Sequence, residues 1–143
     1  ALEKAAVASV ERQTNRLLIA RQVVLRLPDL PSYREPVELP GGYVSTLDSV
    51  VADGETITGA QAYGDAPAIL VPGSDWPSVT GKGYPVIITY TAGFETVPAD
   101  LIAAVKMMAA HLYEHRGAVE EGKAAPVPMG LEWLMAPHRI RPV

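Results

Sequence analysis

The chain of 143 residues carries 12 lysine and arginine residues against 16 aspartate and glutamate residues, and it contains no cysteine. This length suits one ordinary domain, and an apolar share of 48% excludes disorder of the whole chain. The lack of cysteine excludes a disulfide scaffold, a thiolate metal site and a cysteine nucleophile. The net charge of −4 does not suit a protein that binds nucleic acid through a broad basic face.

An N-terminal helix is predicted over the first 15 residues, with Asn15 as its expected end. The apolar or small residues that recur there at helical spacing are Leu2, Ala5, Ala6, Ser9 and Val10. No capping residue precedes Ala1, so the pattern predicts that the helix begins before it and that earlier residues are absent. The sequence leaves open whether this helix lies on the surface of its own domain or inside a partner.

An antiparallel β module of five to six strands is predicted over residues 17–92. Its strand-like segments are Leu17–Leu27, Pro36–Leu39, Tyr43–Val51, Glu55–Thr58, Ala68–Val71 and Val86–Thr91. Glycine-containing turns separate the segments, and Gly81-Lys82-Gly83 is interpreted as a hairpin turn because it lacks the spacing of a phosphate-binding loop.

The main helix is predicted over residues 98–116, and its apolar face points to the core. That face consists of Leu101, Val105, Met108 and Leu112, flanked by Ile102 and Ala109. A loop over residues 117–128, a short helix from Met129 to Met135 and an extended tail over residues 137–143 follow. The predicted fold is α+β, with an N-terminal helix, a small antiparallel β module, a long C-terminal helix, a short helix and the tail. Residues 1–136 form its single domain.

The main helix carries a possible metal motif. His111, Glu114 and His115 match the H-x-x-E-H pattern of some zinc proteases, in which two imidazoles one turn apart bind the ion and the glutamate acts as a base. Such a site needs a third ligand, and only Glu120, Glu121, Glu132 and His138 follow. Histidines at the rim of an apolar helix face are common, so a structural role is the favoured interpretation, with a small zinc-dependent hydrolase as the alternative.

The sequence shows no convincing catalytic constellation, and it favours structural roles for both tryptophans. Trp76 is expected to anchor a loop over the sheet, and Trp133 to pack the final turn or a neighbouring molecule. The longest apolar stretch, Ala66 to Pro72, is far shorter than the ~20 residues of a membrane span. No signal peptide opens the chain, so contact with a membrane is not expected.

Several stretches occur in an order that is hard to obtain by chance. They are residues 16–28, 37–40, 44–51, 84–93 and 97–118, followed by Pro128, Gly130, Leu134, Pro137 and Arg139. In this order they resemble the head-to-tail connector (adaptor) proteins of long-tailed bacteriophages and phage-like gene transfer agents. The resemblance covers the chain from Arg16 onward.

The resemblance implies a structural protein of the virion neck, assembled in the host cytoplasm, with no enzymatic activity and no metal or cofactor. Such proteins form a homo-oligomeric ring of twelve subunits between the portal and the stopper or tail, and DNA passes through the lumen without specific binding. Another neck or tail structural protein is a further alternative.

The basic C-terminal end is the expected contact with portal or tail. The candidate partner-binding residues are Trp133, His138, Arg139, Ile140, Arg141 and Val143. If the tail orders only on assembly, deletion of residues 138–143 leaves the domain folded and abolishes portal attachment. The body carries the acidic excess, with 7 basic and 11 acidic residues over 1–97, which would let DNA slide past without sticking.

Overall fold

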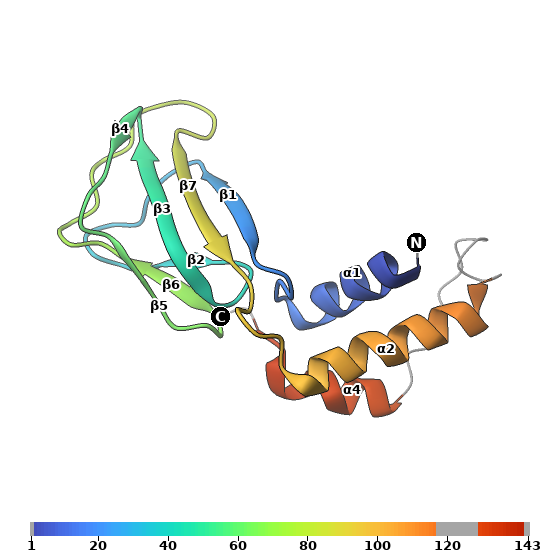
Figure 1. Cartoon of the computed structure of the whole chain (residues 1–143). Coiled ribbons are helices and arrows are strands. Elements are labelled where there is room, and N and C mark those ends of the chain that lie inside the picture. The colour runs from blue at the N-terminus through green and yellow to red at the C-terminus, as the bar shows by residue number, and fades with distance from the viewer. Residues whose placement is uncertain (1, 117–128, 142–143) are drawn as a thin grey trace.

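The computed structural model describes residues 2–116 and 129–141, and Figure 1 shows a β module beside a layer of helices. The helices are α1 (Leu2–Thr14), α2 (Ala99–Glu114), α4 (Met129–Met135) and the short 3-10 helix η1 (Ala136–His138). The strands are β1 (Arg21–Leu27), β2 (Val37–Leu39), β3 (Val44–Ala52), β4 (Glu55–Thr56), β5 (Gln61–Tyr63), β6 (Ala68–Val71) and β7 (Val86–Ala92).

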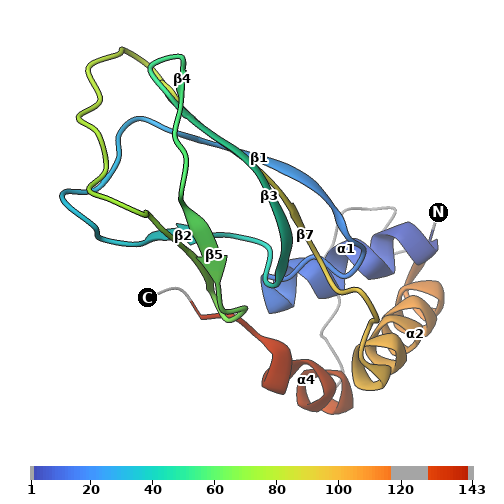
Figure 2. The ribbon, with the colours of Figure 1, turned by 60° about the vertical axis from the view of Figure 1, so that its left-hand side comes forward.

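Two antiparallel sheets make up the β module. The larger sheet has the strand order β1-β7-β3-β4, and the smaller has the order β2-β6-β5. Leu39 and Leu70 of the smaller sheet share one buried cluster with Val50 and Ile88 of the larger sheet. The sheets therefore pack face to face, and Figure 2 shows them as two walls on either side of this core.

Strand β7 lies in the middle of the larger sheet, between β1 and β3. Val86, Ile88, Tyr90 and Ala92 are buried, whereas the residues between them are half-buried. This period of two, in a run of β-branched and aromatic residues, is typical of a strand that places one face in a core.

Tyr90 places a polar group at the edge of this core. Its hydroxyl donates a hydrogen bond of 2.6 Å to the carbonyl oxygen of Pro40, in the loop after β2. Burial raises the pKa of Tyr90 to about 12, so the phenol stays protonated and remains a donor at neutral pH. The bond ties the larger sheet to the end of a strand in the smaller one.

The helices form a second core. Its buried residues are Ala6, Val10, Leu18, Leu101, Ala104, Met108, Leu131 and Met135. α1 and α4 both pack against α2, and the three helices surround this core (Figures 1 and 2). α4 runs antiparallel to α2, because Gly130 lies beside Met107 whereas His138, after α4, lies beside Asp100 at the start of α2. None of the described helices is long and apolar enough to cross a membrane.

Gly93 marks the passage from the sheets to the helices. Its φ is 129°, and a Cβ at this position would lie 2.5 Å from the Cα of Ala20. The backbone N–H of Gly93 donates to the carbonyl of Tyr43. Phe94, the residue after Gly93, forms an isolated β-bridge with Ile19. Only glycine fits here, because any side chain would push apart the two segments that enter and leave the β module.

The predicted α+β class, with an N-terminal helix and antiparallel strands, is confirmed. α1 ends at Thr14, and Asn15 adopts a left-handed φ of 58° at the predicted exit. The helix expected over residues 98–116 runs from Ala99 to Glu114, and the last α-helix of the described chain, α4, is short.

The β module differs from the prediction in two respects. Strand β5 was not predicted, because its residues Gln61-Ala62-Tyr63 include no β-branched residue. The interpretation of Gly81-Lys82-Gly83 as a hairpin turn is wrong, because β6 and β7 belong to different sheets. The Asp53 carboxylate instead binds this loop, accepting hydrogen bonds from the backbone N–H groups of Thr80 (3.0 Å) and Gly81 (2.9 Å).

The buried stripe of α2 is rotated from the predicted one. Leu101 and Met108 are buried as expected, but Ala104 and His111 are buried with them, and Ile102 is 44% exposed. The reason is that α2 packs against both α1 and α4, whose positions the sequence of α2 does not reveal.

We predict that replacing Tyr90 by Phe lowers the free energy of unfolding by about 1–2 kcal/mol, because the Pro40 carbonyl loses its hydrogen bond. Urea denaturation followed by circular dichroism measures the change. Tyr84→Phe is the matched control, since Tyr84 is 65% exposed and should tolerate the same substitution. Equal stabilities of the two variants would show that the Tyr90 bond contributes nothing.

Candidate functional site

The C-terminal segment is bound to the end of α1. The backbone N–H of Ile140 donates to the carbonyl of Thr14 (2.9 Å), and the Asn15 side chain donates to the carbonyl of Ile140 (2.9 Å). Ile140 itself is only 6% exposed. The left-handed backbone of Asn15 ends the helix and directs this amide toward a segment 125 residues away.

Arg16 lies beneath this contact and is 6% exposed. Its Nε donates to the carbonyl of His138 at 2.5 Å, and its guanidinium carbon lies 5.4 Å from the centre of the Phe94 ring. Nη1 lies 3.7 Å from the Asp65 carboxylate, which is an ion-pair distance but too long for a hydrogen bond. A buried charge is costly unless it is paired, so these three partners hold Arg16 in one place.

His138 connects the C-terminal segment to the start of α2. Its Nε2 lies 2.6 Å from Oδ2 of Asp100, and since an ionised carboxylate only accepts hydrogen bonds, Nε2 carries the proton. Oδ1 of Asp100 accepts from the backbone N–H of Leu101. The hydrogen bond from His138 is the main cause that lowers the pKa of Asp100.

Arg139 completes this set of contacts. Its Nε donates to the carbonyl of Gln13 (2.9 Å), and its Nη2 donates to the Glu132 carboxylate of α4 (2.9 Å). We call residues 137–140, with the residues of α1, α2 and their flanks that bind them, the C-terminal clasp. The prediction of an extended tail is therefore wrong for residues 137–140, because η1 and these bonds dock the segment on its own domain.

The structure distributes the candidate partner-binding residues over different environments. Trp133 is 74% exposed and Arg141 is exposed, so both are accessible to another molecule. His138 and Arg139 are half-buried in the clasp, and Ile140 is buried there. Val143 lies outside the described residues.

An apolar surface on α4 and η1 was missed apart from Trp133. We call its residues the α4 face: Met129, Trp133, Ala136 and Pro137, all of which are exposed. The signal was present in the sequence Met-Gly-Leu-Glu-Trp-Leu-Met, because a helix with one charged residue in seven has apolar side chains on every side.

The His111 and His115 pair forms a packed cluster in α2. The ring centres lie 4.5 Å apart, and Nδ1 of His115 lies 3.0 Å from the carbonyl oxygen of His111. No group of three potential metal ligands occurs within residues 2–116 and 129–141. Glu120 and Glu121, two of the possible third ligands, lie outside these ranges. The part of the chain that can be examined gives no support to a zinc site.

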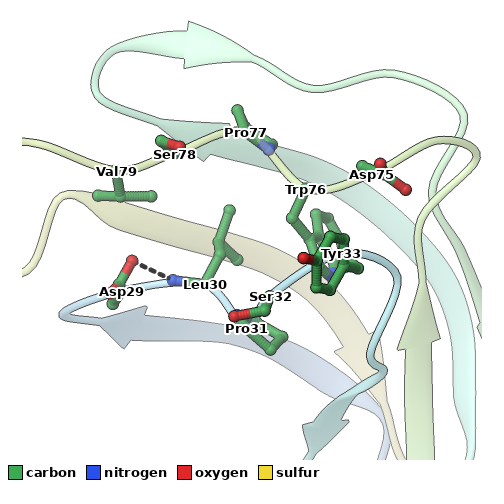
Figure 3. A pocket seen from close by; sticks show the side chains of 10 residues that line it. All are labelled: Asp29, Leu30, Pro31, Ser32, Tyr33, Asp75, Trp76, Pro77, Ser78 and Val79. Atoms are coloured by element: carbon green, nitrogen blue, oxygen red, sulfur yellow. Dashed lines mark hydrogen bonds between the residues drawn. The ribbon is translucent and has the colours of Figure 1, made fainter.

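An open hollow of about 450 Å³ lies between two loops at the end of the β module away from the helices (Figures 1 and 3). Trp76 holds the loops together, because its backbone N–H donates to the Tyr33 carbonyl and its indole N–H to the Glu35 carbonyl, both at 2.7 Å. Asp29 and Asp75 lie at opposite ends of the hollow. Trp76 thus anchors a loop, as expected.

Comparison with known proteins gives a consistent answer at the level of structure. The neck of a native GTA particle, computed with C12 symmetry, contains a chain that is 29% identical with a TM-score of 0.80, covering 99% of this chain and 81% of that one. A chain in the neck of an empty GTA particle, computed with C6 symmetry, is 28% identical with a TM-score of 0.79. The match covers 99% of this chain and 76% of that one. A chain in the virion of a native gene transfer agent (GTA) particle is 29% identical with a TM-score of 0.74. The match covers 99% of this chain and 76% of that one.

In structure and sequence, the chain is similar to chains of GTA necks and of a GTA virion. This confirms the resemblance found in the sequence and the expected location in a virion neck. No known family pattern matches the chain, and no curated protein matches it.

We predict that Ile140→Ala lowers the free energy of unfolding of this protein by about 2–4 kcal/mol, because it removes a buried side chain from the clasp. Arg141→Ala, at the exposed next position, should change stability by less than about 0.5 kcal/mol. Chemical denaturation of the two variants measures the difference. A variant Ile140→Ala as stable as the wild type would mean that the segment contributes nothing to the fold.

By the same argument, deletion of residues 138–143 should destabilise the domain, contrary to the expectation from the sequence.

A second prediction concerns acid. Because the pKa of Asp100 is lowered in the folded state, its contribution to stability is present above the ordinary carboxyl pKa and is lost as pH falls through the lowered value. We expect Asp100→Asn to lose less stability than the wild type between about pH 5 and pH 2. His138→Gln should show a similarly weaker dependence of stability on pH, since the hydrogen bond from this imidazole is the main cause of the lowered pKa of Asp100. Parallel stability profiles for wild type and Asp100→Asn would contradict the assignment.

Proposed function

We propose that this chain is a head-to-tail connector that assembles into a ring of twelve subunits between the portal and the stopper or tail. The observation that carries the proposal is the match over 99% of the chain to a neck structure computed with C12 symmetry. At 29% identity over this span, the likeness reaches beyond a shared fold. Neck structures computed with C12 and C6 symmetry support a ring-shaped oligomer.

The surface chemistry supports a role in assembly. A ring is built from heterologous contacts, so each subunit must present apolar surface that its own core does not use. The α4 face is such a surface, with Met129 72% exposed and Trp133 74% exposed. Exposed tryptophan is uncommon on a monomer, whereas buried tryptophan often dominates the binding energy of an interface.

The charge distribution supports passage of DNA through the ring. Residues 1–97 carry 11 acidic and 7 basic side chains, so the β module and α1 have a net negative charge. A polyanion is repelled by such a surface and moves past it without being held. This part of the proposal requires no base-specific contact and no catalytic residue.

The portal contact is proposed for Arg141, the first residue after the clasp. Ile140 is held by Thr14 and Asn15, and Arg141 is the first residue after it that is exposed. Arg141 follows directly on the docked Ile140, so its side chain can contact an acidic site on a neighbouring protein without disturbing the fold. No observation favours the zinc-dependent hydrolase, which is not proposed.

We predict that the purified chain mixed with portal protein forms rings of about twelve subunits on the portal, as the C12 neck implies. Truncation after Ile140 keeps the clasp and should leave both the fold and the ring intact while weakening attachment to the portal. Electron microscopy and native mass spectrometry detect the ring, and a portal pull-down measures attachment.

Arg141→Lys is the control for charge, and it should retain attachment. A stable monomer that is indifferent to portal would contradict the connector function. Normal attachment by the chain truncated after Ile140 would contradict only the assignment of the portal contact to the C-terminal end.

A further inference from the structure

The α4 face belongs to a helix that is apolar on two opposite sides. Leu131 and Met135 point into the helical core and are fully buried, whereas Met129 and Trp133 are exposed. Glu132, the single charged residue of α4, is paired with Arg139 of the clasp. A helix that is apolar on two opposite sides is normally buried on both, and within residues 2–116 and 129–141 nothing covers the outward side of α4.

A second apolar surface lies on α1, across the helical layer. A hollow of about 310 Å³ is lined by Glu3, Lys4, Val7, Ala8, Glu11 and Ile19, which we call the α1 hollow. Ile19 is 61% exposed, which is unusual for a side chain of this size and polarity.

One wall of the α1 hollow is fixed by a charged network. The Glu11 carboxylate accepts a hydrogen bond from the backbone N–H of Leu18 (3.1 Å) and pairs with Arg21 (3.1 Å). These bonds hold the turn between α1 and β1, which carries Ile19. The hollow is therefore formed before any partner arrives, and little conformational entropy is lost on binding.

We infer that the α4 face of one copy packs into the α1 hollow of the next copy around the ring. The inference rests on the proposed ring and assigns the contact that closes it. Ala6 and Val10 of α1 and Leu131 and Met135 of α4 are buried in the same helical core, so the outward surfaces of the two helices face away from that core in different directions. This is the arrangement that a heterologous contact between identical subunits requires, and a contact of two α4 faces would stop at a dimer.

The two surfaces are chemically complementary. Val7, Ala8 and Ile19 give the hollow an apolar lining for the indole of Trp133. A buried indole N–H needs an acceptor, and the carboxylate of Glu3 on the rim can supply one. The α4 face brings no charged side chain of its own, so it adds no charge to the interface.

The inference is tested with two variants that each remove one surface. Trp133→Glu places a charge on the α4 face, and Ala8→Glu places one in the α1 hollow. Both positions are exposed in the single copy, so both variants should fold with melting temperatures close to that of the wild type. Each alone should form no ring on the portal. Met129→Glu and Ile19→Glu are second variants of the same surfaces.

A mixture of the two variants gives the decisive measurement. Trp133→Glu retains an intact α1 hollow and Ala8→Glu an intact α4 face, so one contact can form between unlike copies and no further contact can follow. With one variant labelled with ¹⁵N, brief cross-linking and native mass spectrometry should detect a one-to-one heterodimer and nothing larger. Tyr84→Glu, at an exposed aromatic residue in the loop before β7, is the control and should form rings normally.

The outcomes separate this inference from the proposed function. If the wild type forms rings and the two variants form them as well, the contact is wrong and the connector function stands. If Trp133→Glu fails while Ala8→Glu succeeds, or if the mixture gives no heterodimer, the α4 face meets a different surface and the inference is overturned. If the wild type forms no ring with portal present, the connector function is overturned together with it.

Discussion

The burial of Arg16 is the constraint on which the rest of the arrangement depends. This guanidinium lies where α1 ends and the chain enters the β module, and it is 6% exposed. Removing a charge from water costs several kcal/mol unless partners replace the solvent. Its partners are the His138 carbonyl, the Phe94 ring and, at a longer distance, the Asp65 carboxylate. They come from the C-terminal segment, the entry to α2 and the smaller sheet, so one buried side chain brings all three parts of the molecule together.

The sequence revealed what local patterns encode. β7 was predictable because its buried and half-buried residues alternate, and α1 because Asn15 suits a left-handed helix exit. The division into two sheets was not predictable, because pairing between strands of two to four residues is decided by distant partners. His111 is likewise buried because α2 meets two other helices, which its own periodicity does not show.

The C-terminal segment shows most clearly where a sequence pattern misleads. Prolines and arginines near a chain end are typical of an extended tail, yet Arg139 donates to the Gln13 carbonyl and Ile140 is buried. The contacts with Gln13, Thr14, Asn15 and Arg16 span more than 120 residues, and each has a backbone carbonyl on one side, a group that every sequence contains. Trp133 was found from its residue type alone, whereas the rest of the α4 face becomes visible only when the buried side of α4 is known.

The clasp also determines how mechanical force would pass through a subunit. Ile140 is bonded to Thr14 and Asn15, at the opposite end of the chain. Tension applied at the C-terminal segment is therefore carried directly into α1, without crossing the β module. In the proposed ring, this would let strain spread through the helical layer while the two sheets remain undistorted.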